Sequence, residues 1–240
     1  MYKKLLIVLL ASSWLVPALA QQPQPTPQER VAQLKAWLQA SHQQMLHYEW
    51  IETTTLLKGG EAKSSKQNQC YYGADGKIQK VPVGDGGEGK AGGPPGLLPA
   101  GRMAKRHAKH EKEELEKYLK SAATLVQSYV PPSPELIQNA INSGNFAVNA
   151  VKPGQQVRID FHNYQKTGDL LSIDIELPTN RLMGMQVSTF MEENADPVNL
   201  DVGMGVLPDG TIYTASTKLV APAKDIVVDI ENTGHRKVGG

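Results

Sequence analysis

Three residues near the middle of the chain have the spacing of a phosphate-binding loop. Gly84, Gly89 and Lys90 match the pattern GxxxxGK, in which backbone amides and the lysine hold phosphates. Ala91 stands where this pattern needs a Ser or Thr to bind magnesium, and Asp85 would place a negative charge against the phosphate. We therefore interpret the match as a coincidence within a glycine-rich linker.

A second group of residues has the spacing of a metal site on a helix. His107, His110, Glu111 and Glu114 recur at three- and four-residue intervals, which places them on one helical face. Histidine and carboxylate ligands of this kind bind zinc. The HExxH pattern of zinc proteases is missing, and lysines flank the group. The favoured interpretation is a solvated helix face, so we predict neither a metal nor a cofactor.

Nucleophilic catalysis has no recognisable motif in this sequence. The GxSxG turn of the hydrolases does not occur, and Cys70 is the single cysteine. A lone cysteine excludes an internal disulfide, and its commonest environment is a small buried position. A cross-link from Cys70 to a partner is the alternative. We expect a binding or structural protein rather than an enzyme.

The first twenty residues have the layout of a cleavable signal peptide. Lys3 and Lys4 precede an apolar stretch, which ends at Pro17 and the small-x-small pattern of residues 18–20. The stretch is shorter than the roughly 20 apolar residues of a membrane span. We expect residues 1–20 to be removed and the protein to act in the periplasm or outside the cell. No later segment is apolar enough to be an integral membrane segment.

Charge excludes one class of partner. The chain has 25 basic and 24 acidic residues, and the only basic residues in 1–20 are two lysines. The remainder is therefore nearly neutral, whereas nucleic-acid binders present a dominant basic surface. Residues 21–28 are a Pro/Gln-rich tether without apolar content. Residues 29–238 are long enough for one domain with a sizeable core.

The N-terminal half of this domain mixes helices and strands. Apolar spacing predicts a helix over 29–47, and β-branched and aromatic residues predict strands over 48–57, 65–72 and 77–83. Gly59-Gly60 and Asp75-Gly76 are hairpin turns. A Gly-rich loop at 84–102 leads into a helical insert at 103–143. The insert holds a long charged helix and, after an N-cap at Ser133, a short second one.

The C-terminal half predicts an antiparallel meander. Six runs between residues 157 and 230 alternate apolar and polar residues with period two, and turn residues separate them. Such a sheet is apolar on one face only, and that face must be covered. The fold class is therefore α+β: a curved, mostly antiparallel, unclosed half-barrel of about eight or nine strands, with helices packed on the concave face.

Methionines are frequent on the predicted apolar face. Methionine adapts its shape and suits surfaces that accept varied apolar ligands, although it also fills ordinary cores. The candidate ligand-binding residues of the apolar face are Met183, Met185, Val187, Leu200, Val202 and Met204.

The order of these elements resembles a known group. A signal peptide, one helix, strand hairpins, a helical insert and a long meander are similar to the periplasmic lipoprotein carriers, the group that includes LolA, LolB and LppX. The resemblance extends over most of residues 29–238 and concerns layout only. It implies an unclosed barrel around helices, with acyl chains bound between sheet and helices. The long charged insert and the Gly-rich stretch depart from the group.

Two functions follow from these patterns. One is a periplasmic carrier or sensor that binds a lipid or lipoprotein acyl chain at the apolar face, with residues 84–102 as a lid. The other is a structural or interaction protein whose partner is another envelope protein. In that alternative the apolar face packs directly on Leu34, Trp37 and Leu119 and leaves no cavity.

Overall fold

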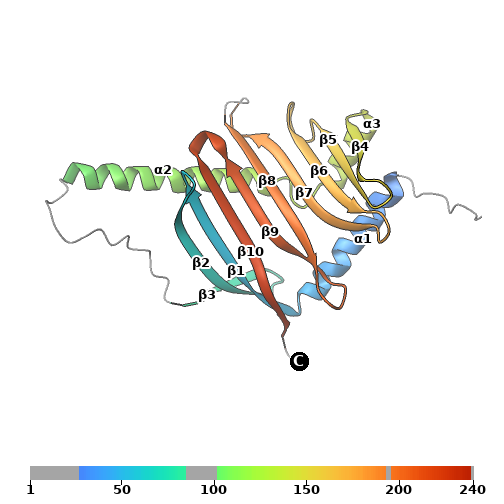
Figure 1. Cartoon of the computed structure of the whole chain (residues 1–240), viewed down its shortest axis with the longest axis horizontal. Coiled ribbons are helices and arrows are strands. Elements are labelled where there is room, and N and C mark those ends of the chain that lie inside the picture. The colour runs from blue at the N-terminus through green and yellow to red at the C-terminus, as the bar shows by residue number, and fades with distance from the viewer. Residues whose placement is uncertain (1–26, 85–101, 193–195, 239–240) are drawn as a thin grey trace, which may run out of the picture.

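The computed structural model describes residues 27–84, 102–192 and 196–238 (Figure 1). The predicted signal peptide and most of the Gly-rich loop lie outside these residues. The described helices are α1 (Pro27–Met45), α2 (Arg102–Gln127), α3 (Pro134–Asn142) and the short 3-10 turn η1 (Pro222–Lys224). The strands are β1 (Tyr48–Lys58), β2 (Glu61–Tyr72), β3 (Ile78–Pro82), β4 (Phe146–Lys152), β5 (Gln156–His162), β6 (Leu170–Glu176), β7 (Arg181–Phe190), β8 (Pro197–Val206), β9 (Ile212–Ala221) and β10 (Ile226–Lys237).

The ten strands of the described residues form one antiparallel sheet, in the order β3-β2-β1-β10-β9-β8-β7-β6-β5-β4. Neighbouring strands are consecutive in sequence except for β1 and β10, whose pairing joins the N-terminal hairpins to the C-terminal meander. The outer strands, β3 and β4, do not pair with each other, so the sheet is not closed. The predicted α+β half-barrel is confirmed.

The three longer helices lie on one side of this sheet. In Figure 1 they are behind the strands, and the N-terminal part of α2 extends past β2. The main core forms between this side of the sheet and the helices; α2 contributes Ala122 and Val126, and α3 contributes Ile137 and Ala140. Within the described residues, no helix combines the length and apolar character needed to cross a membrane.

Local signals in the sequence explain most of the element boundaries. Gly59 and Gly60 turn β1 into β2 with φ of +65° and +75°, a conformation that glycine adopts without strain. Ser133 caps α3 as predicted, because its hydroxyl accepts a hydrogen bond from the amide of Leu136. β2 begins at Glu61, four residues before the predicted start, and continues the hairpin directly from the turn.

β4 (Phe146–Lys152) is a strand that the sequence pattern does not predict. It lies at one edge of the sheet, where only β5 pairs with it. Its outer residues are exposed, and Val148 is 56% exposed. Its apolar residues do not alternate strictly with polar ones, so the strand lacks the period-two pattern by which the other strands of the meander are predicted.

Candidate ligand-binding groove

A cavity of about 500 Å³ lies between α2 and the part of the sheet formed by β8, β9, β10, β1 and β2. The strands supply most of its lining and the helix supplies the cover. Its lining residues are Thr54, Leu56, Ser64, Lys66, Leu119, Ala123, Val126, Gln127, Val130, Leu200, Val202, Thr214, Thr217, Leu219, Val228 and Ile230. We call this cavity the α2 groove.

Two rows of residues across neighbouring strands form the floor of the α2 groove. Residues opposite each other in an antiparallel pair point to the same face, so register alone aligns them. The first row is Leu200, Leu219, Val228, Leu56 and Ser64. The second row is Val202, Thr217, Ile230, Thr54 and Lys66. Both rows are apolar on β8 and polar on β2, so the floor changes character along its length.

The same two rows continue onto β7, where packed side chains cover them. On β7 the first row reaches Val187 and the second reaches Met185. Both are buried, in one cluster with Tyr129 and the α3 residues. The apolar face is therefore a filled core from β5 to β7. From β8 to β2 it lines the groove, and Leu200, Val202 and Leu219 are both buried core residues and part of the lining.

The cover of the α2 groove comes from one side of the helix and the segment after it. Leu119, Ala123 and Val126 recur at intervals of four and three residues, which places them on one helical face. Val130 follows the end of the helix and completes the cover. Ala123 has the smallest side chain of these, which leaves space between the helix and the floor.

The segment after α2 is fixed by a buried hydrogen-bond network. Tyr129 is fully buried, and its hydroxyl donates to Oδ2 of Asp169 at 2.6 Å and lies 2.9 Å from Oγ1 of Thr189. The same carboxylate oxygen accepts the backbone amides of Gln165 and Lys166. Burial, and then the hydrogen bond to Asp169, raise the pKa of Tyr129. The network holds the C-terminal end of the cover against β6 and β7.

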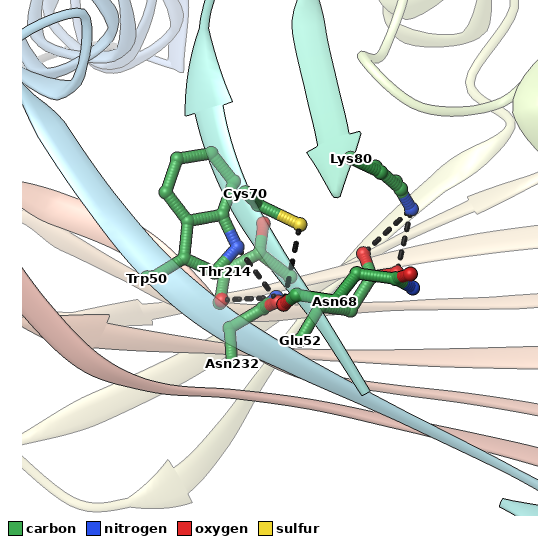
Figure 2. Close-up of polar contacts among 7 residues, drawn as sticks. All are labelled: Trp50, Glu52, Asn68, Cys70, Lys80, Thr214 and Asn232. Atoms are coloured by element: carbon green, nitrogen blue, oxygen red, sulfur yellow. Dashed lines mark hydrogen bonds and ion pairs between the residues drawn. The ribbon is translucent and has the colours of Figure 1, made fainter. Parts of the chain in front are cut away.

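Polar residues gather where the floor passes from β1 to β2 (Figure 2). Glu52 precedes Thr54 by two residues, so it faces the same side of β1, and it is 8% exposed. Both of its carboxylate oxygens accept hydrogen bonds from Nζ of Lys80, at 2.6 and 2.7 Å. Glu52 is thus neutralised by a partner from the edge strand β3.

A second chain of contacts in Figure 2 links the groove to Trp50. The indole nitrogen of Trp50 donates to Oδ1 of Asn232 at 3.0 Å, and the amide of Asn232 donates to the backbone oxygen of Thr214 at 2.9 Å. Cys70 lies beside this chain and is fully buried. The predicted buried position is confirmed, and burial raises the pKa of the thiol.

The predicted ligand-binding residues divide into three groups. Leu200 and Val202 line the α2 groove. Met185 and Val187 are buried in the filled half, and Met204 packs at the border of the main core. None of these last three lines the groove. Their side chains share the apolar face, but the position of the helices decides which part of that face stays open.

Met183 does not follow the predicted alternation. A bulge in the pairing of β6 with β7 leaves Met183 without an opposite residue, since Asp174 pairs with Gly184 and Ile175 with Leu182. Leu182 consequently takes the core position and is 1% exposed. The sulfur of Met183 instead lies 3.7 Å from the guanidinium of Arg181. The placement of Met183 on the apolar face is therefore wrong.

Most of the groove lining is missing from the predicted set. Leu56, Val228 and Ile230 occur in strands that the sequence does predict, but their pairing across β1 and β10 joins residues more than 170 positions apart. The sequence signal for this part of the lining is the apolar alternation of Ile226, Val228 and Ile230. This alternation shows which side chains of β10 face the core, but it does not show that β1 is the neighbouring strand.

The other candidate chemistry falls mostly outside the described part of the chain. Gly89 and Lys90 of the phosphate-loop match lie there, as does the side chain of His107. On the exposed part of α2, Nε2 of His110 is 3.7 Å from the carboxylate of Glu114. Among the described residues, no three histidine, cysteine or carboxylate side chains are grouped as metal ligands.

Comparisons with known proteins found little. No protein-family model matches the chain, and no curated protein matches it. Among solved structures, a DUF1329 family protein from Desulfovibrio piger is similar over 86% of this chain and 94% of that chain, with 14% identity and a TM-score of 0.36. A likeness this distant gives no indication of function.

Proposed function

We propose that this protein is a non-enzymatic binding protein that holds an apolar ligand, such as a lipid or a lipoprotein acyl chain, in the α2 groove. The observation that carries the proposal is the pair of residue rows beneath α2, which leave about 500 Å³ between sheet and helix. Small-molecule pockets span about 300–1,000 Å³ and are lined mainly by apolar side chains.

The energetics of a hydrocarbon chain support this proposal. Burial of each methylene contributes about 0.8 kcal/mol, so a chain of ten buried methylenes contributes about 8 kcal/mol before the costs of ordering it. Leucine, valine and isoleucine side chains dominate both the floor and the cover. The hydroxyls of Thr54 on β1 and of Thr214 and Thr217 on β9 add polar contacts along the lining.

In this proposal the protein acts in the periplasm or outside the cell, and residues 1–20 are its signal peptide. A carrier or sensor of acyl chains in that compartment exchanges its ligand with membranes or with lipoproteins. The protein should therefore be expressed with residues 1–20 and recovered from the periplasm. N-terminal sequencing should then begin at Gln21.

Native mass spectrometry of that material, followed by organic extraction, tests the ligand. The expected result is an added mass that disappears on extraction and is identified as a lipid. Protein stripped of lipid should bind a fluorescent fatty acid such as cis-parinaric acid in a 1:1 ratio. A bare mass together with no binding of this probe would overturn the proposal.

The filled half of the apolar face favours a second candidate, a structural or interaction protein. Met185 and Val187 are as buried as ordinary core residues, and α2 carries many exposed charges that a partner protein of the envelope can meet. This candidate predicts a co-purifying protein and no extractable lipid. Chemical cross-linking in cells, followed by mass spectrometry, distinguishes it from the lipid carrier.

A further inference from the structure

The β2 end of the α2 groove presents one lysine that has no ionic partner among the residues the structure describes. Lys66 lies in the second floor row, opposite Thr54, and is exposed. It belongs to the groove lining. Among the described residues, no carboxylate forms an ion pair with it and no hydrogen bond engages its side chain.

Glu52, an acidic residue on the same face of β1, is already neutralised. Glu52 is two residues before Thr54 on β1, and its two carboxylate oxygens are bound by Nζ of Lys80 (Figure 2). Together, the side chains of Glu52, Lys80 and Lys66 thus have a net charge of +1. A cation at the end of an apolar groove complements an anionic group attached to a hydrocarbon chain.

The floor is long enough for one extended acyl chain. The rows extend over five strands, β8 to β2, and strands about 4.8 Å apart give a length of about 19 Å. The cavity is about 500 Å³, and α2 covers it along one helical face. A long acyl chain placed along the rows has its terminal methyl near Leu200 and Val202 and its head group near Lys66.

We propose that the α2 groove binds a long-chain fatty acid, with the carboxylate at Lys66 and the hydroxyls of Thr54 and Ser64 beside it. The inference rests on the proposed function and adds the class of ligand and its orientation. The two hydroxyls are within the lining and donate to the carboxylate oxygens that the ammonium group leaves free. One lysine matches the single charge of a carboxylate.

Competition binding with palmitate and with the uncharged hexadecanol tests this inference. Both ligands displace cis-parinaric acid from lipid-stripped protein, and they share the same chain length. Palmitate should bind roughly fivefold more tightly than hexadecanol at low salt, a preference of the size expected for an exposed charge pair with hydrogen bonds. The preference should shrink at high ionic strength.

Two variants test whether Lys66 causes the preference for palmitate over hexadecanol. Lys66→Gln should abolish the preference for palmitate over hexadecanol, and Lys66→Glu should make palmitate the weaker ligand. Lys77→Gln is the matched control, because Lys77 is an exposed lysine in the β2–β3 turn and is not part of the lining. Its preference should equal that of the unaltered protein.

The outcomes separate this inference from the proposed function. Equal binding of palmitate and hexadecanol by the unaltered protein, or a preference that survives Lys66→Gln, would overturn the carboxylate site while leaving an apolar groove. Failure of both ligands to displace the probe, or failure of the probe to bind, would overturn the groove function itself.

Discussion

Tyr118 on α2 donates a 2.7 Å hydrogen bond from its hydroxyl to Oδ1 of Asp196, the residue before β8. The ammonium of Lys224 lies 5.6 Å from the centre of the same ring. Burial, and then the contact with Asp196, raise the pKa of Tyr118. This bond attaches the middle of the helix to the sheet at the border of the groove.

Tyr118→Phe should weaken the attachment of α2 to the sheet while the aromatic ring stays packed in place. The ring remains and one hydrogen bond is lost, which costs about 1 kcal/mol. We expect faster hydrogen exchange in peptides from α2, measured by mass spectrometry, and faster release of bound probe. Tyr71→Phe is the control, since Tyr71 is 37% exposed on β2 and lies outside the groove lining. Equal exchange in the two variants would contradict the role of the Tyr118 bond.

Tyr129→Phe should destabilise the whole fold more than Tyr118→Phe does. Among the described residues, the Oδ1 oxygen of Asp169 is already buried without a partner, and the substitution removes one of three donors from its Oδ2 oxygen. It also takes the Tyr129 hydroxyl away from the buried hydroxyl of Thr189, and a buried polar group that loses its partner costs about 1–3 kcal/mol. Urea unfolding monitored by tryptophan fluorescence measures the difference. A loss below that of Tyr118→Phe would show that the network contributes little.

Alkaline pH should destabilise the protein through its buried tyrosines. The pKa values of Tyr129, Tyr118 and Tyr164 are raised above the ordinary 10.0, chiefly by burial. The folded state therefore keeps protons that the unfolded state releases, and stability is full below about pH 10 and falls as pH rises further. We expect these tyrosines to leave the free energy of unfolding unchanged from pH 7 to 9 and to lower it above pH 10. The decline should be shallower in Tyr129→Phe.

Ala123→Phe should block the groove from above. Ala123 faces the floor, so a phenyl ring at this position occupies space that the ligand needs. We expect the affinity for cis-parinaric acid to fall at least tenfold, with stability unchanged or increased because new apolar surface is buried. Thr124→Phe places the same ring on the exposed side of α2 and should bind normally. Undiminished binding by Ala123→Phe would place the ligand elsewhere.

Two truncations should separate the filled core from the groove. Met185→Ala removes buried volume from the packed half and should cost about 2–5 kcal/mol of stability. Leu56→Ala removes a half-buried floor residue and should cost less stability while weakening probe binding. Urea unfolding and probe titration of both variants supply the comparison. The same pattern of losses in both would mean that the two halves act as one core.

The alternation of residues 157–230 was sufficient to predict the antiparallel meander and its apolar face, because a period of two fixes the face of each side chain. It was insufficient at Met183, because one extra residue in β7 puts the side chains before the bulge on the opposite face from the one that the alternation predicts. No composition signal marks that residue, since a methionine suits either face.

The position of the groove depends on contacts that local patterns do not contain. Val228 lies beside Leu56 only because β10 pairs with β1 across the whole length of the chain. The helix that covers them, α2, lies between these strands in sequence, and its apolar side is compatible with any part of the sheet face. The division between filled core and groove is therefore a property of the tertiary arrangement.

The free edge of β2 has a consequence for which part of a ligand is selected by size. β3 pairs only with residues 68–72 of β2, so β2 is itself the edge of the sheet beside Ser64 and Lys66, where the two rows end. A closed barrel would bound a ligand at this end, whereas here a group attached to the ligand's head can project past the sheet. Size selection should then act on the hydrocarbon chain and not on the group attached to its head.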